Sequence, residues 1–518
     1  MISLGLGSLL AQDNYPRNRE ADVQGYVFHL SLNDSNNQII GHTEIEVDFS
    51  KVTDTFSLDL VSQHGKYGMT VTEVLENHRK ADYTHRNDKI LIRPRPGDSL
   101  KRQYSIKYSG VPQKGLVIDT TRYGKRSFFG DNWPNLARHW LPCVDHPYDK
   151  ASVEFRVTAP EYYDVLATGE KIEESNLGNG LKLTAYREQT PVAMKVVTIG
   201  VTRFASKILG RAGGVEVSAW VYPENRLEGF SDFEEATRIM DYYIGHVGPY
   251  AYAKLANMQA KTQWGGLENA GTIAYKESII NGKNEIQGLM AHEIAHQWFG
   301  DSVTENSWNH VWLSEGFATY FTILYQESVY GDQKRMEELK KDRGEIIEYY
   351  HKNPSPVVDY RIQDPKKVLN TNTYQKGGWV LNMLRHRMGD DAFWKGIRSY
   401  YSKFRNANVM SSDFREVMEE KSGLELGEFF NQWLYVEGYP EIDWKWSYKK
   451  GKLTITVEQL QRHQLFHFPL EFGIVVDGKM KVETVQVMDK RTVFDMSVSS
   501  KPQDVLIDPG IWLLYDER

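Results

Sequence analysis

The stretch His292-Glu293-Ile294-Ala295-His296 decides how this chain folds and what it can bind. Apolar residues recur at helical spacing over residues 286–299, which predicts a buried helix that Gly300 can end. Two histidines four residues apart on a helix lie on one face, one turn apart. Their imidazoles can bind one Zn²⁺ at about 2.0–2.1 Å. Glu293 lies beside them, where a carboxylate can accept a proton from a water at the metal.

A third ligand follows further along the chain. Glu315 comes after His296 with 18 residues between them, and it opens a second apolar-periodic stretch that runs to about Tyr330. Two antiparallel helices joined by a loop would bring Glu315 back to the two histidines. Two histidines, one glutamate and an open fourth position are typical of a catalytic zinc site rather than a closed structural one. The sequence therefore predicts one Zn²⁺ per chain, bound by His292, His296 and Glu315; two ordinary surface histidines are the alternative.

These residues resemble the zinc motif of a known family. His-Glu-x-x-His, 18 residues and then a glutamate within Trp312-Leu313-Ser314-Glu315-Gly316-Phe317-Ala318 are similar to the gluzincin aminopeptidases, the group that includes aminopeptidase N and leukotriene hydrolase. Three other segments agree with family motifs: Arg138-His139-Trp140-Leu141-Pro142-Cys143-Val144-Asp145-His146-Pro147, Gly265-Gly266-Leu267-Glu268-Asn269 and Tyr374-Gln375-Lys376-Gly377. The resemblance runs in the family's order from about residue 20 to about residue 440.

The resemblance implies a zinc-dependent aminopeptidase that hydrolyses the N-terminal bond of peptides with a free α-amine. Glu293 would be the general base, and Tyr374 would stabilise the oxyanion. Four residues would bind the substrate: Gly265, Gly266, Glu268 and Asn269. The Glu268 carboxylate would pair with the cationic α-amine. A thermolysin-type endopeptidase, which would not need Glu268, is one alternative; a catalytically inactive scaffold is another, against which the intact motif residues argue.

One departure from the family pattern lies ahead of Arg138. Relatives often carry Gln or Glu a few residues before the Arg-x-x-x-Pro-Cys segment, where that side chain also touches the substrate amine. Here the stretch reads Gly130-Asp131-Asn132-Trp133-Pro134. Asp131 or Asn132 can substitute, or Trp133 can instead shape the pocket for the first side chain. The preferred N-terminal residue therefore stays open.

The chain has 518 residues, too many for one core, and its patterns predict a multidomain α+β fold. Residues 20–214 are β-rich and predict a large β-sandwich-like domain. Residues 215–437 carry both parts of the zinc motif and resemble a thermolysin-like catalytic domain. Residues 438–518 return to strands and predict a small β-sandwich. The long C-terminal helical domain of many relatives is not expected, so we expect a more open site.

Local patterns around the motifs predict individual elements. Residues 232–246 and, later, 391–401, 412–421 and 426–434 have helical periodicity. Residues 257–262 read as a strand that leads into Gly265-Gly266. An edge strand there would present backbone groups to an extended peptide.

Composition and charge limit the classes of binding partner that we expect. The formal net charge is −7 and no cluster of Lys and Arg is evident, which argues against nucleic acid and anionic membranes. No apolar run reaches about 18 residues, so no stable membrane insertion is expected. The single cysteine, Cys143, excludes an intrachain disulfide and reads as a small packed side chain. Peptides remain the expected partners, and the oligomeric state is not predicted.

The first residues form a separate segment, 1–19. Met1 to Leu10 are small and apolar, and Ala11-Gln12-Asp13 follows like a cleavage site. The stretch resembles the end of a secretory signal without its basic start. We therefore expect a periplasmic or secreted protein; the alternative is a disordered N-terminus on a cytoplasmic protein.

Overall fold

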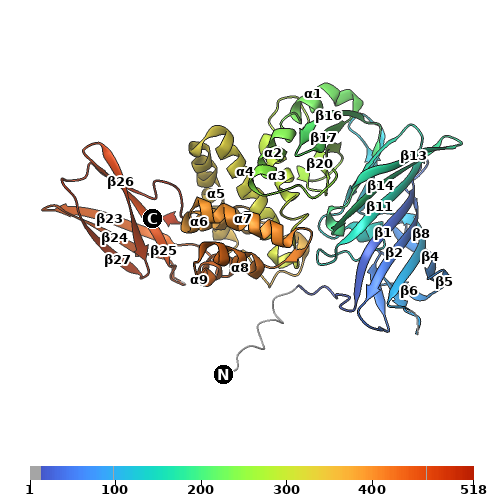
Figure 1. Cartoon of the computed structure of the whole chain (residues 1–518), viewed down its shortest axis with the longest axis horizontal. Helices are drawn as coiled ribbons and strands as arrows, with labels where there is room; N and C mark the ends of the chain where they lie inside the picture. The colour runs from blue at the N-terminus through green and yellow to red at the C-terminus, as the bar shows by residue number, and fades with distance from the viewer. Residues whose placement is uncertain (1–12, 97–98, 463) are drawn as a thin grey trace. The chain divides into compact units, whose positions relative to one another are not determined.

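The computed structural model describes residues 13–96, 99–462 and 464–518. The stretch that resembles a truncated signal, residues 1–12, lies outside them. The chain divides into two compact units (Figure 1). The first holds the chain up to Ser314 with Ile362–Val368 and Ile397–Phe414, and the second holds Glu315–Arg361, Leu369–Gly396 and Arg415–Arg518. The boundary after Ser314 falls inside helix α4 (Trp312–Tyr330), so one continuous helix carries the chain from the first unit to Glu315.

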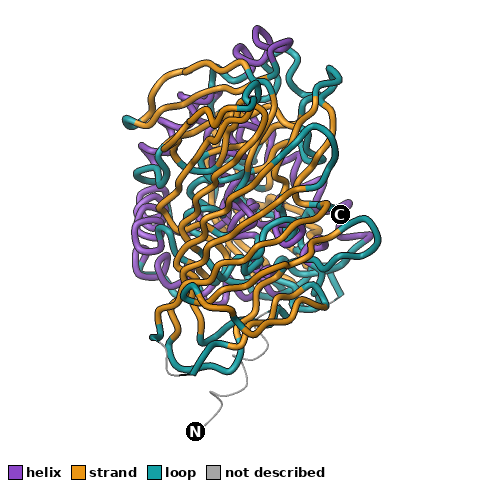
Figure 2. The backbone as a smooth tube through the Cα atoms, turned by 90° about the vertical axis from the view of Figure 1, so that its right-hand side faces the viewer, coloured by secondary structure: helices purple, strands orange, loops and turns teal. Residues whose placement is uncertain are grey.

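The first unit begins with an eight-stranded sheet, whose long strands run side by side in Figure 2. Every second side chain of β2 (Ile39–Phe49) is buried, because alternate residues of a strand point to opposite faces. One face of the sheet therefore packs on the core while the other faces solvent. The strand order is β13 (Glu170–Gly178), β14 (Leu181–Val192), β11 (Ala151–Pro160), β1 (Ala21–Ser31), β2, β8 (Lys101–Val111), β4 (Gly68–Glu76) and β5 (Arg79–Lys80).

Two smaller sheets complete this β-rich region. One contains β12 (Asp164–Ala167), β15 (Ile199–Thr202), β10 (Arg126–Asp131) and β9 (Gly115–Thr120). The other contains β3 (Phe56–Asp59), β7 (Lys89–Arg93) and β6 (Asp82–Arg86). The large N-terminal β-rich domain predicted from the sequence is thereby confirmed.

A five-stranded mixed sheet follows and carries the helix with the two histidines. Its order is β16 (Ala205–Ala212), β17 (Val215–Val221), β18 (Lys254–Ala260), β20 (Thr272–Lys276) and β19 (Gly266–Leu267). The predicted strand at 257–262 corresponds to β18, which lies in the middle of the sheet between two parallel neighbours. The edge strand is the two-residue β19, which pairs with β20 alone.

Helices fill the rest of the first unit. The helix predicted over residues 232–246 begins four residues later, as α2 (Ala236–His246), and a break separates it from the preceding helix α1 (Arg226–Asp232). The break has a tertiary cause: the Asp232 carboxylate accepts hydrogen bonds from the backbone N–H groups of Asn281, Gly282 and Asn284. Helix α3 (Gln287–His296) follows and carries the motif histidines. A two-stranded parallel pair, β21 (Thr304–Glu305) and β22 (Asn408–Val409), lies close to the end of this unit.

The second unit is helical and then β. After Glu315, α4 is followed by α5 (Asp332–Lys352), α6 (Gly377–Met388) and α9 (Gly427–Phe430), while α7 (Asp390–Phe404) and α8 (Ser411–Ser422) give residues to both units. The C-terminal strands form a four-stranded sheet of β27 (Arg491–Ser497), β24 (Lys452–Gln459), β23 (Glu441–Lys449) and β29 (Asp516–Glu517), and a three-stranded sheet of β26 (Lys479–Val487), β25 (Phe468–Val476) and β28 (Asp504–Ile507).

Contacts inside the second unit connect its helices to its sheets. Arg335 of α5 donates to the Gly510 carbonyl, and its guanidinium lies 4.1 Å from the centroid of the Trp512 ring. Asn382 of α6 donates to the Ile511 carbonyl. Among the residues that the structure describes, no helix is long and apolar enough to cross a membrane.

Candidate active site

Helix α3 brings His292 and His296 together. Their Nε2 atoms lie 3.1 Å apart, and their ring centroids are separated by 4.7 Å. A tetrahedral zinc ion with bonds of 2.0–2.1 Å separates two ligand atoms by about 3.4 Å. The spacing of four residues on one helical face thus gives the two imidazoles the separation of neighbouring zinc ligands.

The ring of His296 is oriented by the chain that follows it. Its Nδ1 lies 3.1 Å from the Phe299 carbonyl and 3.0 Å from Ser314 Oγ. A proton on Nδ1 donated to that carbonyl leaves the lone pair on Nε2, the arrangement that a metal-ligating histidine requires. Gly300 allows this turn, because its φ is +123° and a Cβ there would lie 2.2 Å from Ser314 Oγ.

Glu315 is the residue after Ser314 in the first turn of α4. The start of this helix is anchored by Trp312, whose Nε1 donates to Ser411 Oγ at 2.8 Å. His292, His296 and Glu315 each offer one ligand atom, and these atoms lie within 4.8 Å of one another. His296 and Glu315 are almost fully buried, at 1% and 3% exposure. Two imidazole nitrogens and one carboxylate oxygen are a donor set that suits Zn²⁺.

Glu293 lies against the edge strand β19. It is 4% exposed, and a Cβ built on Gly266 would lie 2.2 Å from its Oε1. The backbone of the Gly-Gly segment can therefore approach the carboxylate only because Gly266 has no side chain. This contact explains in physical terms why a glycine stands at the second position of the segment.

Glu268 carries a buried carboxylate oxygen without a hydrogen-bond partner among the described residues. The side chain is 5% exposed, and its Oε1 makes no hydrogen bond to them. The Nδ2 and Oδ1 atoms of Asn269 are likewise buried without such a partner. Buried polar atoms of this kind call for an explanation, and a cationic or polar ligand is one. Both residues belong to the segment that the sequence predicted to bind substrate.

Gln297 connects this segment to helix α3, and no local sequence pattern selects it. Its Nε2 donates to the Glu268 carbonyl at 3.1 Å and to Asp301 Oδ2 at 2.9 Å. Its Oε1 accepts from the Gly271 N–H at 2.8 Å. One side chain adjacent to His296 thus fixes the backbone on both sides of Asn269. Only tertiary contacts reveal this role, because residue 297 carries no local signal.

Tyr374 lies in a π-helical turn, Asn372–Lys376, that leads into α6. Such turns are frequent at functional sites. This turn packs against the first turn of α4: a Cβ on Gly316 would lie 2.9 Å from the Gly377 Cα and 3.2 Å from the Thr373 carbonyl oxygen. The absence of a side chain at Gly316, the residue after Glu315, therefore lets the backbone of the Tyr-x-Lys-Gly segment approach the first turn of α4.

Residues 131–133, where the sequence departs from the family pattern, have different environments. Both polar atoms of the Asn132 side chain make hydrogen bonds within the fold. Its Nδ2 donates to the Met194 and Val197 carbonyls, and its Oδ1 accepts from Trp140 Nε1. Asp131 accepts from Thr262 and Trp264. Burial raises the pKa of Asp131, and the negative charge of Glu268 raises it further. Of these two residues, Asp131 is the one that places a second carboxyl group near Glu268.

Trp133 belongs to an aromatic row. Its ring centroid lies 6.4 Å from that of Trp264 and 5.3 Å from that of Trp308, both in edge-to-face geometry. Trp264 lies in the loop before β19, and its indole N–H donates to Asp131. The row thus connects residues 130–134 with the Gly-Gly segment.

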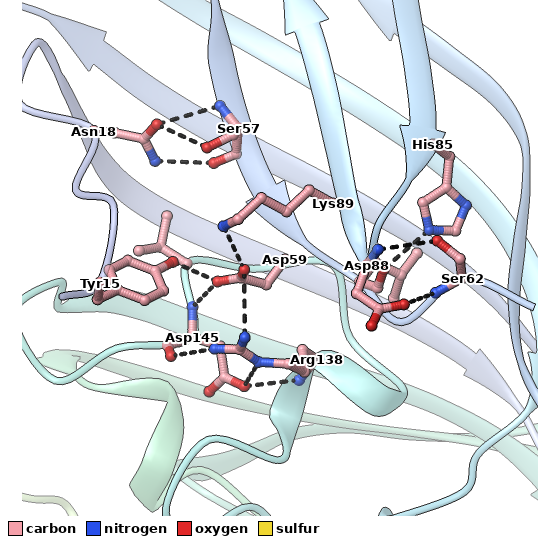
Figure 3. Close-up of polar contacts among 12 residues, drawn as sticks. Tyr15, Asn18, Ser57, Asp59, Ser62, His85, Asp88, Lys89, Arg138 and Asp145 are labelled. Atoms are coloured by element: carbon pink, nitrogen blue, oxygen red, sulfur yellow. Dashed lines mark hydrogen bonds and ion pairs between the residues drawn. The ribbon is translucent and has the colours of Figure 1, made fainter. Parts of the chain in front are cut away.

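The Arg-x-x-x-Pro-Cys-x-Asp segment builds a buried ion-pair network (Figure 3). Arg138 donates to Asp145 Oδ2 at 2.9 Å and lies 3.6 Å from Asp59 Oδ1, to which Lys89 donates at 2.7 Å. Burial opposes ionisation of Asp59, but Arg138 and Lys89 outweigh it and hold the pKa of this carboxyl below its usual value. Cys143 is buried beside this network, as predicted for a packed side chain. The segment supports the fold of the first unit.

The chain ahead of β1 is tied to the approach to α4. Residues 13–19 belong to the N-terminal segment 1–19, for which the sequence predicts a signal remnant or a disordered N-terminus. Asp13 accepts from His146 Nε2, Ser307 Oγ and the Trp308 N–H at 2.9–3.0 Å. Arg17 donates to the Asn306 carbonyl at 2.6 Å. These contacts hold the loop that precedes the Glu315 helix, a role that the sequence did not suggest.

Two family models match the chain. The Peptidase M1 N-terminal domain matches residues 22–193, and the Peptidase family M1 domain matches residues 232–433. These two domains correspond to the β-rich region and to the region that carries the His-His-Glu donor set. The chain belongs to peptidase family M1, as the resemblance in its motifs implied.

Individual relatives are longer than this chain. It is 24% identical over 509 residues to "Probable aminopeptidase 1" of Sulfurisphaera tokodaii, with 92% of this chain and 61% of that protein covered. It is 26% identical over 327 residues to glutamyl aminopeptidase of Mus musculus, with 60% and 35% covered. The chain therefore spans less than two thirds of the length of these relatives.

The fold matches that of a solved enzyme. The M1 zinc metallopeptidase of Deinococcus radiodurans superposes with a TM-score of 0.69 at 23% identity, covering 83% of this chain and 98% of that one. A mutant of the same enzyme, bound to a Tyr-Ser-Ala substrate, gives a TM-score of 0.68. At this level of identity the likeness establishes a common fold.

Proposed function

We propose that this protein is a zinc-dependent aminopeptidase that hydrolyses the N-terminal peptide bond of peptides with a free α-amine. Family membership, the aminopeptidase names of its relatives and the His292, His296 and Glu315 donor set support this proposal. The observation that carries it is the buried Glu268 carboxylate, which has an unpartnered oxygen and lies one residue beyond the strand that contacts Glu293.

Glu293 is proposed as the general base. When bound, Zn²⁺ would supply Lewis acidity that polarises the scissile carbonyl and makes a water more acidic. The Glu293 carboxylate accepts a proton from the attacking water and passes it to the departing amine nitrogen. Its burial and its contact with the Gly266 backbone keep it in one position. His292, His296 and Glu315 would hold the ion.

Tyr374 is proposed as the oxyanion donor. Its phenolic O–H donates to the oxygen that becomes negative as water adds to the carbonyl, so the hydrogen bond strengthens toward the transition state. The packing of Gly377 on Gly316 supports this role, because it fixes the Tyr374 turn next to the helix of Glu315.

Glu268 is proposed to make the enzyme an exopeptidase. Its carboxylate pairs with the cationic α-amine, and only a substrate whose amine lies one residue from the scissile carbonyl then aligns with Glu293. Gly265 and Gly266 present strand-edge backbone to the peptide, and Asn269 offers its amide atoms. Asp131 and the Trp133 row are the candidates for side-chain selection.

Two alternatives make different predictions. A thermolysin-type endopeptidase would cleave blocked peptides in their interior, and it gives no reason to bury Glu268. An inactive scaffold would retain the fold without turnover, and it gives no reason for the donor set and Glu293 to be intact together.

The test is a panel of chromogenic aminoacyl amides, each measured beside its N-acetylated counterpart. The proposal predicts hydrolysis of several free-amine substrates and very poor hydrolysis of every acetylated one. Efficient internal cleavage of blocked peptides would favour the endopeptidase, and no turnover of any substrate by zinc-loaded protein would favour the scaffold.

A further inference from the structure

A second group of metal-ligating side chains lies on the eight-stranded sheet, far along the chain from the zinc motif. It consists of His29 on β1 and of His42 and Glu44 on β2. One ligand atom from each lies within 4.8 Å of the other two. We propose that these three residues form a binding site for a divalent transition-metal ion of the Zn²⁺ or Cu²⁺ class. This inference does not depend on the proposed peptidase activity.

The sheet register places the three side chains together. His29 and His42 are direct partners in the antiparallel ladder of β1 and β2. Directly opposed residues have Cβ atoms about 4.5–5.5 Å apart, and here the two imidazole centroids are 5.0 Å apart. Glu44 follows His42 by two residues and therefore points to the same face. Its Oε1 lies 3.1 Å from His29 Nε2, close to the separation of two ligands on one ion.

The His42 ring has the supporting contact that ligating histidines usually have. Its Nε2 lies 2.8 Å from Ser105 Oγ on the neighbouring strand β8. A hydroxyl on one ring nitrogen fixes the orientation and tautomer of the imidazole.

The two cationic side chains beside the group are each paired with a carboxylate outside it. Arg156 is the register partner of His29 on β11, and Lys107 is the partner of His42 on β8. Each already has a carboxylate of its own: Arg156 lies 2.5 Å from Glu154, and Lys107 lies 2.7 Å from Glu73. The negative charge of Glu44 is therefore not consumed by either cation and remains for an ion between the two imidazoles.

The group lies where an ion can reach it. The side chains of His29 and Glu44 are 36% and 55% exposed. His42 and Glu44 also line a depression of about 370 Å³ on this sheet, with Glu46, His78 and Gln103 around it. A site this open leaves coordination positions to water and exchanges its ion readily. The two imidazole ligands favour Cu²⁺ and Zn²⁺ over Mg²⁺ and Ca²⁺.

The test is a calorimetric zinc titration of the full chain after its first zinc equivalent has been loaded. The site predicts a second, weaker equivalent in the wild type. His29→Ala and His42→Ala should each weaken that second equivalent by at least about tenfold, the lower end of what even outer-shell changes cost. Both variants should keep the first equivalent and the wild-type rate. His64→Ala, at an exposed histidine elsewhere in the same domain, is the matched control and should bind like the wild type.

A conservative variant guards against misfolding of the histidine variants. Glu44→Gln keeps the size of the side chain but loses its charge, and it should weaken the second equivalent while its circular dichroism stays unchanged. A wild type that binds only one equivalent would overturn the proposal. So would a second equivalent that persists when His29 and His42 are both replaced. Loss of the first equivalent, by contrast, would bear on His292, His296 and Glu315 and not on this site.

Discussion

Two histidine pairs in this molecule carry the same donor set in different surroundings. His292 and His296 come from one turn of a helix, with Glu315 from the next helix, and two of these three residues are almost fully buried. His29 and His42 come from opposite strands, with Glu44 beside them, on a solvent-facing sheet. Two imidazoles and a carboxylate can therefore define a metal site without defining a catalyst.

The surroundings of each pair account for that difference. The helical pair adjoins Glu293, which contacts the Gly266 backbone, and the segment carrying the buried carboxylate of Glu268. The strand pair lies beside Ser105 and beside two ion pairs that do not include it, Arg156 with Glu154 and Lys107 with Glu73. Fixed, buried acid and base groups are what transition-state stabilisation requires. We therefore expect reactivity at the helical pair alone, and the following changes test that expectation.

The same substitution at both pairs should have the most different effects. Glu293→Gln should lower kcat by about 10²–10⁴-fold and keep zinc, because the amide cannot accept the water proton while the ligands are unchanged. Glu44→Gln, its matched control, should leave kcat unchanged. Steady-state kinetics with metal analysis of both variants makes the comparison. Near-normal turnover by Glu293→Gln would exclude this residue as the base.

Tyr374→Phe should have the next largest effect. It removes an oxyanion donor, which is worth about 10²–10³-fold in rate, so kcat should fall far more than KM rises. Tyr330→Phe, at an exposed tyrosine of α4, should change neither. An effect confined to KM would instead indicate that Tyr374 packs against the substrate.

Glu268→Gln should act mainly on binding. Hydrogen bonds to charged groups contribute about 1.5–3 kcal/mol, so KM for free-amine substrates should rise roughly 10- to 100-fold. The variant should also discriminate less against N-acetylated substrates, because the amide no longer attracts a cation. The ratio of kcat/KM for each amide and its acetylated form measures this. An unchanged ratio would remove Glu268 from the amine site.

The last expected effect is on stability rather than on rate, and it concerns the surroundings of the helical pair. His310 precedes α4 and accepts from the Ser411 N–H through Nδ1, and burial lowers its pKa to about 4. The folded state therefore binds fewer protons than the unfolded state between about pH 6.5 and pH 4, so stability is full above this range and falls as the pH drops through it.

His310→Asn should reduce that loss by up to about 3 kcal/mol near pH 4, since the pKa difference sets its size. Urea unfolding at pH 7 and at pH 4–5 provides the measurement, with His64→Asn as the exposed control. Identical pH dependence in wild type and His310→Asn would show that this histidine does not titrate with folding.

Features that depend on local spacing could be predicted from the sequence. The histidine pair follows from helical geometry, and the β-rich region over residues 20–214 follows from alternating apolar residues such as those of β2. Strand β13 has no such apolar period, because it is an edge strand whose side chains are exposed or half-buried. The choice of Tyr374 among 30 tyrosines came only from the family resemblance.

Features that depend on distant segments could not be predicted. The helix break at Asp232 arises from backbone groups about fifty residues further along. Gln297 and Asp13 position motif residues through contacts that no local pattern encodes. The need for glycine at residue 316 becomes evident only once both helices are in place, because the Gly377 backbone then lies close to it.

The most direct test of the central claim is elemental analysis of protein purified without added metal, with activity followed as the metal is removed and restored. We predict one tightly bound Zn²⁺ per chain whose loss abolishes aminopeptidase activity and whose return restores it. His296→Ala should lose both zinc and activity, whereas His42→Ala should keep both. A metal-free protein with full activity would contradict the account.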